Sequence, residues 1–510
     1  MPRPESTNIF SEISIFFREK DDDKAIRTIM DITKHLKLSE KSLSFESHWN
    51  CKYTRLQVFE LLLLFPLFMI KNTFHYSDSS LAGIISCKKD VFYRFMENGS
   101  FDWRKIVYRI NLQLLNKIIL RSDENKSKDP VCLIIDDTDL PKTGAKIEKI
   151  GRIFSHVTHS SLLGFKALFL CRTDGKTQTV LDFSLHGEEG KHPEKPFGMT
   201  KKQRDKQYSK VREETEAVHK RIGEYTKSKI EKAIEMVEHA IREGIRFDYL
   251  LADSWFTCTD IVKFIKSRHM CCHYLGMIKM GKTKYLFEKK LFSAKELVKL
   301  LQARKAINYS RKLHCHYGVA DVELGGVRVR LFFCRRSKNA DWNGFVKRGQ
   351  SQACLGYAER RNPRMKFNGL LTTNIKLDFN EAYRVYSRRW VVEVYFKDAK
   401  GLLGLGKSQS RDFASQIASI SITMLQYNIL STIKRFSAYQ TIGGLFHEAT
   451  DGVIQLSVTE RIWGLLQEIV RIIAEAFETD DERVMDALIN RSETFKHYIN
   501  FDRLTLKQAA

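Results

Sequence analysis

Acidic side chains follow two apolar runs of the sequence, and a third acid lies in a later stretch. Asp136 and Asp137 come directly after the first run, Asp253 ends the second, and Glu393 belongs to the later stretch. Three carboxylates brought to one place can hold two hard divalent cations through oxygen ligands. Two such cations stabilise the attacking and leaving oxygens of an in-line displacement at phosphorus, where negative charge concentrates. These acids are therefore candidates for phosphodiester chemistry.

The stretch 386–400 predicts a mostly apolar helix with one narrow charged stripe. It contains neither Pro nor Gly and is followed by Gly401, a common helix stop. At about 100° per residue, five side chains share an arc of about 80°: Tyr386, Arg389, Glu393, Lys397 and Lys400. We expect this helix to pack in the interior with its stripe facing a site. The alternative is a structural ladder of salt bridges between residues three and four positions apart.

The overall charge favours a polyanionic partner. The 510 residues include 85 Lys and Arg against 61 Asp and Glu, a formal net charge of +24. Nucleic acid is the first candidate partner and an anionic membrane the second. The longest apolar run, Leu61 to Ile70, is too short to span a bilayer, and Met1 to Lys24 lacks the apolar segment of a secretory signal. We expect a cytoplasmic protein with no membrane association.

Cysteine usage indicates a reduced compartment and no structural zinc. The ten Cys form no C-x-x-C pair, and several lie in apolar runs as small hydrophobic residues. His314 and His316 flank Cys315, but adjacent strand residues point to opposite faces and no second ligand pair follows.

The order of the predicted elements indicates an α/β core that brings the acids together. Short apolar runs and amphipathic stretches predict three strands, a helix, a strand, a helix and a strand. The predicted strands are 131–135, 165–172, 177–186, 247–253, 272–279 and 370–375, with helices at 230–242 and 259–268. Because acids end the first and fourth strands, they can meet Glu393 at one sheet edge.

Five segments are expected along the chain. Residues 1–125 form a helical N-terminal region for DNA-end binding, although its short helices around Gly99 also fit an ordinary helical bundle. The others are the first part of the core at 126–280, a β-rich insertion at 281–368, the last core strand and Glu-bearing helix at 369–406, and a helical C-terminal region for dimerisation at 407–510.

The stripe resembles the YREK signature of the IS-four family of bacterial insertion-sequence transposases. The matching residues, spaced Y-x2-R-x3-E-x6-K, are Tyr386, Arg389, Glu393 and Lys400. The resemblance covers roughly residues 130–405 and implies a ribonuclease-H-like core with a D-D-E triad and a β-strand insertion before the Glu. The first-Asp motif places the acid before Thr or Ser, which implies Asp137 rather than Asp136. We then expect Asp136 to point to the opposite side of the strand.

For this chain, the resemblance implies a cut-and-paste DNA transposase. It would bind double-stranded DNA at terminal inverted repeats, and target DNA, as a homodimer. It would carry out hydrolytic nicking and then transesterification by the freed 3′-hydroxyl. The implied ligands of two Mg²⁺ ions, for which Mn²⁺ would substitute, are Asp137, Asp253 and Glu393. The implied DNA contacts near the cleaved end are Tyr386, Arg389 and Lys400.

Two other functions stay open. A ribonuclease-H-like nuclease or resolvase would use the same metals without strand transfer, but the large insertion and the stripe argue against it. A domesticated, non-catalytic DNA-binding protein would be expected to have lost an acid, and none is lost. Transposases of this type cut the second strand through a hairpin with a base flipped onto an aromatic residue, and Trp342 in the insertion is a candidate for that residue.

Overall fold

The computed structural model describes most of the chain and divides it into two compact units. The described residues are 36, 38–79, 81–82, 86–120, 129–267, 272–336, 367–436, 439–451 and 469–472. The smaller unit is Met1–Ser39, Glu46–Phe92 and Tyr439–Ala510, and the larger is Glu40–Phe45 and Tyr93–Ala438. None of the helices in these described ranges combines the length and apolarity that a bilayer span requires.

The described part of the smaller unit is helical. Helix α4 (Arg55–Leu64) begins with a capping box, in which Thr54 and Gln57 each accept a hydrogen bond from the other's backbone N–H. The helix ends inside the apolar run Leu61–Ile70, because the ring nitrogen of Pro66 has no hydrogen to donate. A 3-10 helix, η1 (Thr73–Asp78), follows, and helix α6 (Lys89–Met96) continues into the larger unit.

In its described residues, the larger unit is built on one sheet of twelve strands. Its core strands are β1 (Cys132–Pro141), β2 (Gly151–Ser155), β3 (Ser160–Thr173), β4 (Gln178–His186), β5 (Tyr249–Ala252) and β6 (His273–Ile278). Strand β3 pairs antiparallel with β1 on one edge, and β2 and β4 share its other edge. Strands β5 and β6 continue parallel to β1 on the far side. The resulting order β4-β3-β1-β5-β6 is the ribonuclease-H-like fold expected for the core.

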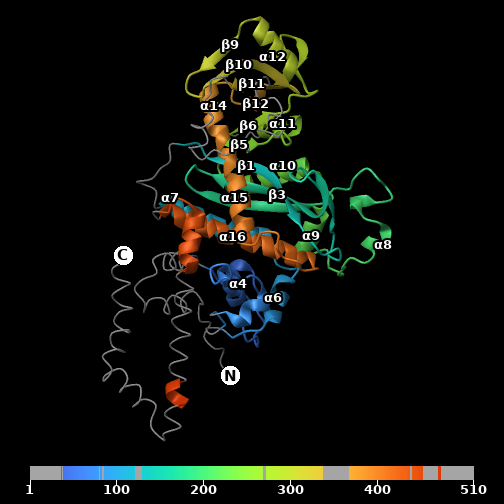
Figure 1. The fold of residues 1–510 in the computed structure, drawn as a ribbon, viewed down its shortest axis with the longest axis vertical. Helices are drawn as coiled ribbons and strands as arrows, with labels where there is room; N and C mark the ends of the chain where they lie inside the picture. Colours follow the sequence, from blue (N-terminus) through green and yellow to red (C-terminus); the bar gives the residue numbers. More distant parts are fainter. Residues whose placement is uncertain are drawn as a thin grey trace, which may run out of the picture. The chain divides into compact units, whose positions relative to one another are not determined.

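The insertion is β-rich, and its strands extend the core sheet. Its elements are β7 (Lys284–Phe287), β8 (Lys290–Ser293), α12 (Ala294–Ala303), β9 (Ile307–Ser310), β10 (Cys315–Leu324) and β11 (Val327–Arg336). Strand β12 (Asn368–Thr372) lies between β6 and β11 and pairs antiparallel with both. Figure 1 shows these strands at the end of the sheet beyond β6. The sequence pattern predicted strands here, but it contained no signal for this continuity.

Helices cover both faces of the core sheet. Outside the insertion, the described helices that lie wholly in the larger unit are α3 (Glu40–Leu43), α7 (Trp103–Leu120), α8 (Lys201–Arg204), α9 (Ala217–Gly223), α10 (Lys229–Arg242), α11 (Thr259–Ser267), α14 (Phe379–Tyr386), α15 (Trp390–Gly401) and α16 (Phe413–Phe436), with 3-10 turns η2 (Pro196–Gly198) and η5 (Ser387–Arg389). On one face, Leu168 and Leu170 share a buried core with α10 and α11. On the other face, the ring centroid of Phe169 lies 5.4 Å from that of Tyr395 and 5.5 Å from that of Phe396, both on α15.

Helices α7 and α16 belong to the same unit as the sheet, so the compact unit does not follow the expected boundaries at 125 and 407. The Asn428 side chain of α16 donates to the carbonyl of Val180 on β4 and to the side-chain oxygen of Asn111 on α7, both at 2.8 Å. These buried hydrogen bonds, together with apolar packing, join the two helices to β4.

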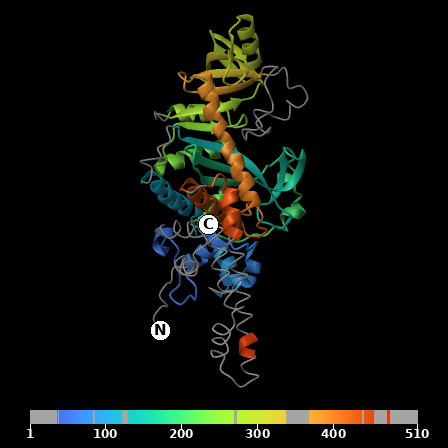
Figure 2. The same ribbon diagram turned by 60° about the vertical axis from the view of Figure 1, so that its left-hand side comes forward.

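The predicted helix 386–400 is part of a longer helical segment with an irregular joint. Its start is set by Asp378, whose side chain accepts from the backbone N–H groups of Asn380 and Glu381. The 3-10 turn η5 separates α14 from α15, and Ser387 donates to the carbonyl of Arg384 at 2.7 Å at this joint. Figures 1 and 2 show the two helices running as one rod across the sheet, from the insertion strands to α16.

Replacing Phe169 with alanine is expected to destabilise the larger unit by about 3–5 kcal/mol, because the ring is fully buried between the sheet and α15. Urea unfolding measures the change. Phe154→Ala on β2 is the matched control, since that ring is 43% exposed and its loss should change stability by about 0.5 kcal/mol or less. Equal losses for the two variants would show that Phe169 does not anchor α15.

Candidate active site

The side chains of strand β1 alternate between the two helix layers, and this alternation separates the neighbouring acids. Asp136 pairs with Phe169 of β3, whose ring contacts α15, so Asp136 lies on the α15 face. Asp137 pairs with Leu168, which belongs to the core on the α10 face. The strand does not end before the acids, because its pairing with β3 continues to Pro141.

On the α15 face, the guanidinium of Arg389 bridges two carboxylates. Its NH1 nitrogen lies 2.6 Å from Oδ2 of Asp136, and its NH2 nitrogen lies 2.6 Å from Oε1 of Glu393. The side chains of Arg389 and Asp136 are 13% and 14% exposed, and that of Glu393 is 30% exposed. Burial at this level strengthens both ion pairs relative to pairs on the surface.

Asp253 brings a third negative charge to the same place. It follows β5, whose last residue, Ala252, pairs with Ile135 directly before Asp136. Burial raises the pKa of Asp136 to about 7, with Arg389 opposing and Asp253 adding to the rise. Burial also raises the pKa of Glu393, again with a contribution from Asp253. One carboxylate thus acts electrostatically on both others, as expected where the charges converge.

Asp137 lies apart from this group, on the other face of β1. Its Oδ2 forms an ion pair with the ammonium of Lys229, at the start of α10. The two neighbouring acids do point to opposite sides of the strand, as anticipated, but Asp136 is the one that faces Glu393. The apolar pattern of β1 does not reveal which side an acid takes, because the residues before the acids are buried on both faces.

The remaining stripe residues have different environments. Lys400 donates to the hydroxyl of Thr138 at 2.7 Å and to the carbonyl of Asp139 at 2.9 Å, so it joins α15 to the end of β1. Burial lowers the pKa of Lys400. Lys397 is exposed, and Tyr386 is half-buried. Of the salt bridges that a ladder along this described stripe would contain, the structure shows the Arg389–Glu393 pair.

A small hydrogen-bond chain supports the turn after Asp253. The hydroxyl of Thr257 donates to the carbonyl of Asp253 at 2.9 Å and lies 2.7 Å from the hydroxyl of Tyr274 on β6. A Cβ at Gly276 would lie 2.3 Å from the Tyr274 hydroxyl oxygen and 2.5 Å from that of Thr257. Only glycine leaves room for this chain.

The donor types at the site suit a hard divalent cation. Asp136, Asp253 and Glu393 supply carboxylate oxygens, which Mg²⁺ and Mn²⁺ prefer. As the side chains stand, no three acidic, His or Cys groups among the described residues lie close enough to hold an ion. The positive charge between Asp136 and Glu393 belongs to Arg389. Metal binding would require the carboxylates to exchange that guanidinium for the ion.

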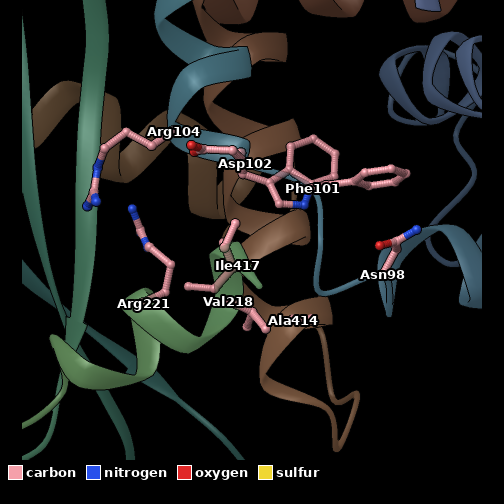
Figure 3. A pocket seen from close by; sticks show the side chains of 10 residues that line it. Asn98, Phe101, Asp102, Arg104, Val218, Arg221, Ala414 and Ile417 are labelled. Atoms are coloured by element: carbon pink, nitrogen blue, oxygen red, sulfur yellow. The ribbon is translucent and has the colours of Figure 1, made fainter. Parts of the chain in front are cut away.

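A separate pocket lies between the beginnings of α7 and α16 and helix α9 (Figure 3). Arg104 and Arg221 line it, and both form ion pairs with the buried Asp182 and Glu224. None of the candidate active-site residues lines this pocket. The charged side chains already neutralise one another, so we assign the pocket to the architecture of the unit. The candidate stacking residue Trp342 lies outside the described residues.

Residues 81–295 match the family model described as DDE superfamily endonuclease. This segment contains Asp136, Asp137 and Asp253 and ends before Glu393. The comparison with curated proteins gave no match. Among solved structures, the chain is similar to a cryo-EM structure of a piggyBac transposase synaptic complex with hairpin DNA, with 11% sequence identity and a TM-score of 0.41, over 87% of this chain and 82% of that chain. The matched segment covers less than half of the chain.

Replacing Arg389 with glutamine is expected to destabilise the protein more at about pH 8 than at about pH 5. With a pKa of about 7, Asp136 is protonated at the lower pH and needs no cation, whereas at the higher pH its charge loses its partner. Because removing the guanidinium raises the Asp136 pKa further, the pH-dependent part of the cost should grow by about 1.4 kcal/mol for each pH unit above that pKa. Urea unfolding in EDTA at both pH values measures it.

Lys397→Gln is the control for this prediction, because Lys397 is an exposed cation on the same helix. Its effect on unfolding should be small at both pH values. An Arg389→Gln cost that does not change with pH would contradict the pairing with Asp136.

Proposed function

We propose that this chain is a DNA transposase that excises and inserts a mobile element by metal-dependent cleavage and strand transfer at terminal inverted repeats. The observation that supports this most directly is the placement of Asp136 and Asp253, each directly after the parallel pairing of β1 with β5, on the side where Arg389 joins Asp136 to Glu393. These acids come from three distant parts of the sequence, and each depends on a different element for its position. The ribonuclease-H-like core and the match to the DDE superfamily endonuclease model agree with it.

In this proposal the catalytic acids are Asp136, Asp253 and Glu393, with Asp136 replacing Asp137 as the first. Two divalent ions, Mg²⁺ or Mn²⁺, would stabilise the attacking and leaving oxygens at phosphorus when bound. The backbone N–H groups of Trp255 and Phe256 donate to Oδ1 of Asp253 at 2.8 and 3.2 Å and fix that carboxylate. Arg389 is positioned to move from the acids to a DNA phosphate, since guanidinium pairs well with either group.

The proposal keeps Tyr386, Arg389 and Lys400 as DNA contacts near the cleaved end, in line with the resemblance to the IS-four family. Lys397 adds an exposed positive charge on the same helix. The net charge of +24 suits a protein that grips DNA phosphates. A homodimer would bring two transposon ends together, and such an enzyme would act in the bacterial cytoplasm, where its DNA lies.

The test is cleavage and strand transfer on a plasmid that carries the DNA flanking the open reading frame, with Mg²⁺ or Mn²⁺. The wild-type protein should excise the bracketed segment and join it to target DNA, and EDTA should stop both steps. Asp136→Asn, Asp253→Asn and Glu393→Gln should each lower cleavage by about a thousandfold or more, because each removes a ligand that neutralises the transition state. Gel-shift assays should show that these variants still bind the ends.

Asp137→Asn is the matched control, with the same substitution one position along the strand. It should keep cleavage within about tenfold of wild type, since its carboxylate lies on the α10 face. An inactive Asp137→Asn protein beside an active Asp136→Asn protein would overturn the assignment. Cleavage without strand transfer would favour a ribonuclease-H-like nuclease or resolvase, and metal-independent binding without cleavage would favour a non-catalytic DNA-binding protein.

A further inference from the structure

Trp255 is a large aromatic side chain left exposed beside the candidate active site. It lies two residues after Asp253 and is 41% exposed. Its backbone N–H donates to Oδ1 of Asp253 at 2.8 Å. Its ring packs edge-on at 4.8 Å between centroids against Phe256, which is 1% exposed. The indole is therefore held at a fixed position relative to the acid while keeping much of its surface open to solvent.

A cation lies over the ring of Trp255. The ammonium of Lys229, the first residue of α10, lies 4.0 Å from the centroid of the Trp255 ring. Its partner in the described part of the chain is Asp137, which pairs with it on the α10 face. An ammonium has three donors, so pairing with one carboxylate leaves capacity for a further acceptor. The Lys229 side chain is 16% exposed.

An exposed aromatic ring next to an ammonium can bind one nucleotide of a single DNA strand. An unpaired base stacks on an aromatic ring whatever its identity, and the adjoining phosphate pairs with a cation. Bases inside a duplex are stacked on one another and cannot offer their faces to the indole. The pair lies next to Asp253 on the α10 side, whereas Glu393 and Arg389 approach the acids from α15.

We propose that Trp255 and Lys229 form a binding subsite for an unpaired nucleotide of the DNA strand at the active site. Trp255 stacks on the base, and Lys229 pairs with its phosphate. Asp137 neutralises Lys229 in the free protein and so limits how strongly the subsite attracts the strand. This inference rests on the proposed function, because it assumes that DNA occupies the acidic site.

The test measures binding of a labelled oligo(dT) single strand of about 12 nucleotides, and of a duplex of equal length, by fluorescence anisotropy in EDTA. Trp255→Ala should weaken single-strand binding by about tenfold to a hundredfold and leave duplex binding nearly unchanged. Trp255→Phe should retain most of the affinity, since it keeps an aromatic face. Tyr309→Ala is the matched control, because that ring on β9 is 46% exposed and lies in the insertion.

The two charged residues should act in opposite directions. Lys229→Gln should weaken single-strand binding and flatten its salt dependence by about 0.7, the value for one phosphate contact on a single strand. Asp137→Asn should tighten binding and steepen that dependence by about the same amount, because it frees the Lys229 charge. If the pair served only to stabilise the fold, both substitutions would weaken binding and lower the melting temperature together.

The inference is overturned if Trp255→Ala binds the single strand as well as Tyr309→Ala does, or if it weakens duplex binding equally. It is also overturned if Asp137→Asn weakens binding. If Asp136→Asn abolishes cleavage but Trp255→Ala does not change single-strand binding, the proposed function stands and only the subsite is ruled out. If the wild-type protein binds neither the single strand nor the duplex, both the subsite and the proposed function are ruled out.

Discussion

The guanidinium of Arg389 bridges the carboxylate of Glu393, four positions along the chain, and that of Asp136, 253 positions away, and the organisation of the site depends on this bridge. Asp136 and Glu393 are both largely removed from water, and two unneutralised negative charges in such a place would repel each other strongly. One planar cation donating to both at 2.6 Å removes that cost and holds α15 against β1. The same negative pair is what would attract a divalent ion.

Apolar packing along the middle of α15 and hydrogen bonds near its end support this bridge. Phe169 and the rings of Tyr395 and Phe396 hold the middle of α15 on the sheet, while Lys400 binds the end of β1 through Thr138 and Asp139. Beyond Lys400, the buried Lys142 ammonium donates to the carbonyls of Gly406 and Ser408 and so holds the segment after α15. The helix therefore has few ways to shift without breaking one of these contacts.

The two faces of β1 divide the charged groups of the site. Asp136 and Thr138 face α15, and Asp137 faces α10 with Lys229 and Trp255. A strand achieves this with adjacent residues because successive side chains point to opposite sides. A nucleic-acid strand crossing the edge of the sheet would thus meet acids at the centre, α15 on one side and an exposed indole with its cation on the other.

Some of this could be predicted from the sequence alone. The apolar runs and the Gly-bounded helix predicted the α/β core, and with the stripe of Tyr386, Arg389, Glu393 and Lys400 they made Asp253 and Glu393 candidates, because helix and strand periods are local properties. Which of Asp136 and Asp137 faces α15 could not be predicted from the apolar pattern, since a strand buried on both faces carries no alternation that marks its sides. The pairing of β1 with β3 determines it. The Arg389 bridge, the Lys229–Trp255 pair and the continuation of the sheet into the insertion likewise depend on contacts between distant segments, which only the tertiary structure determines.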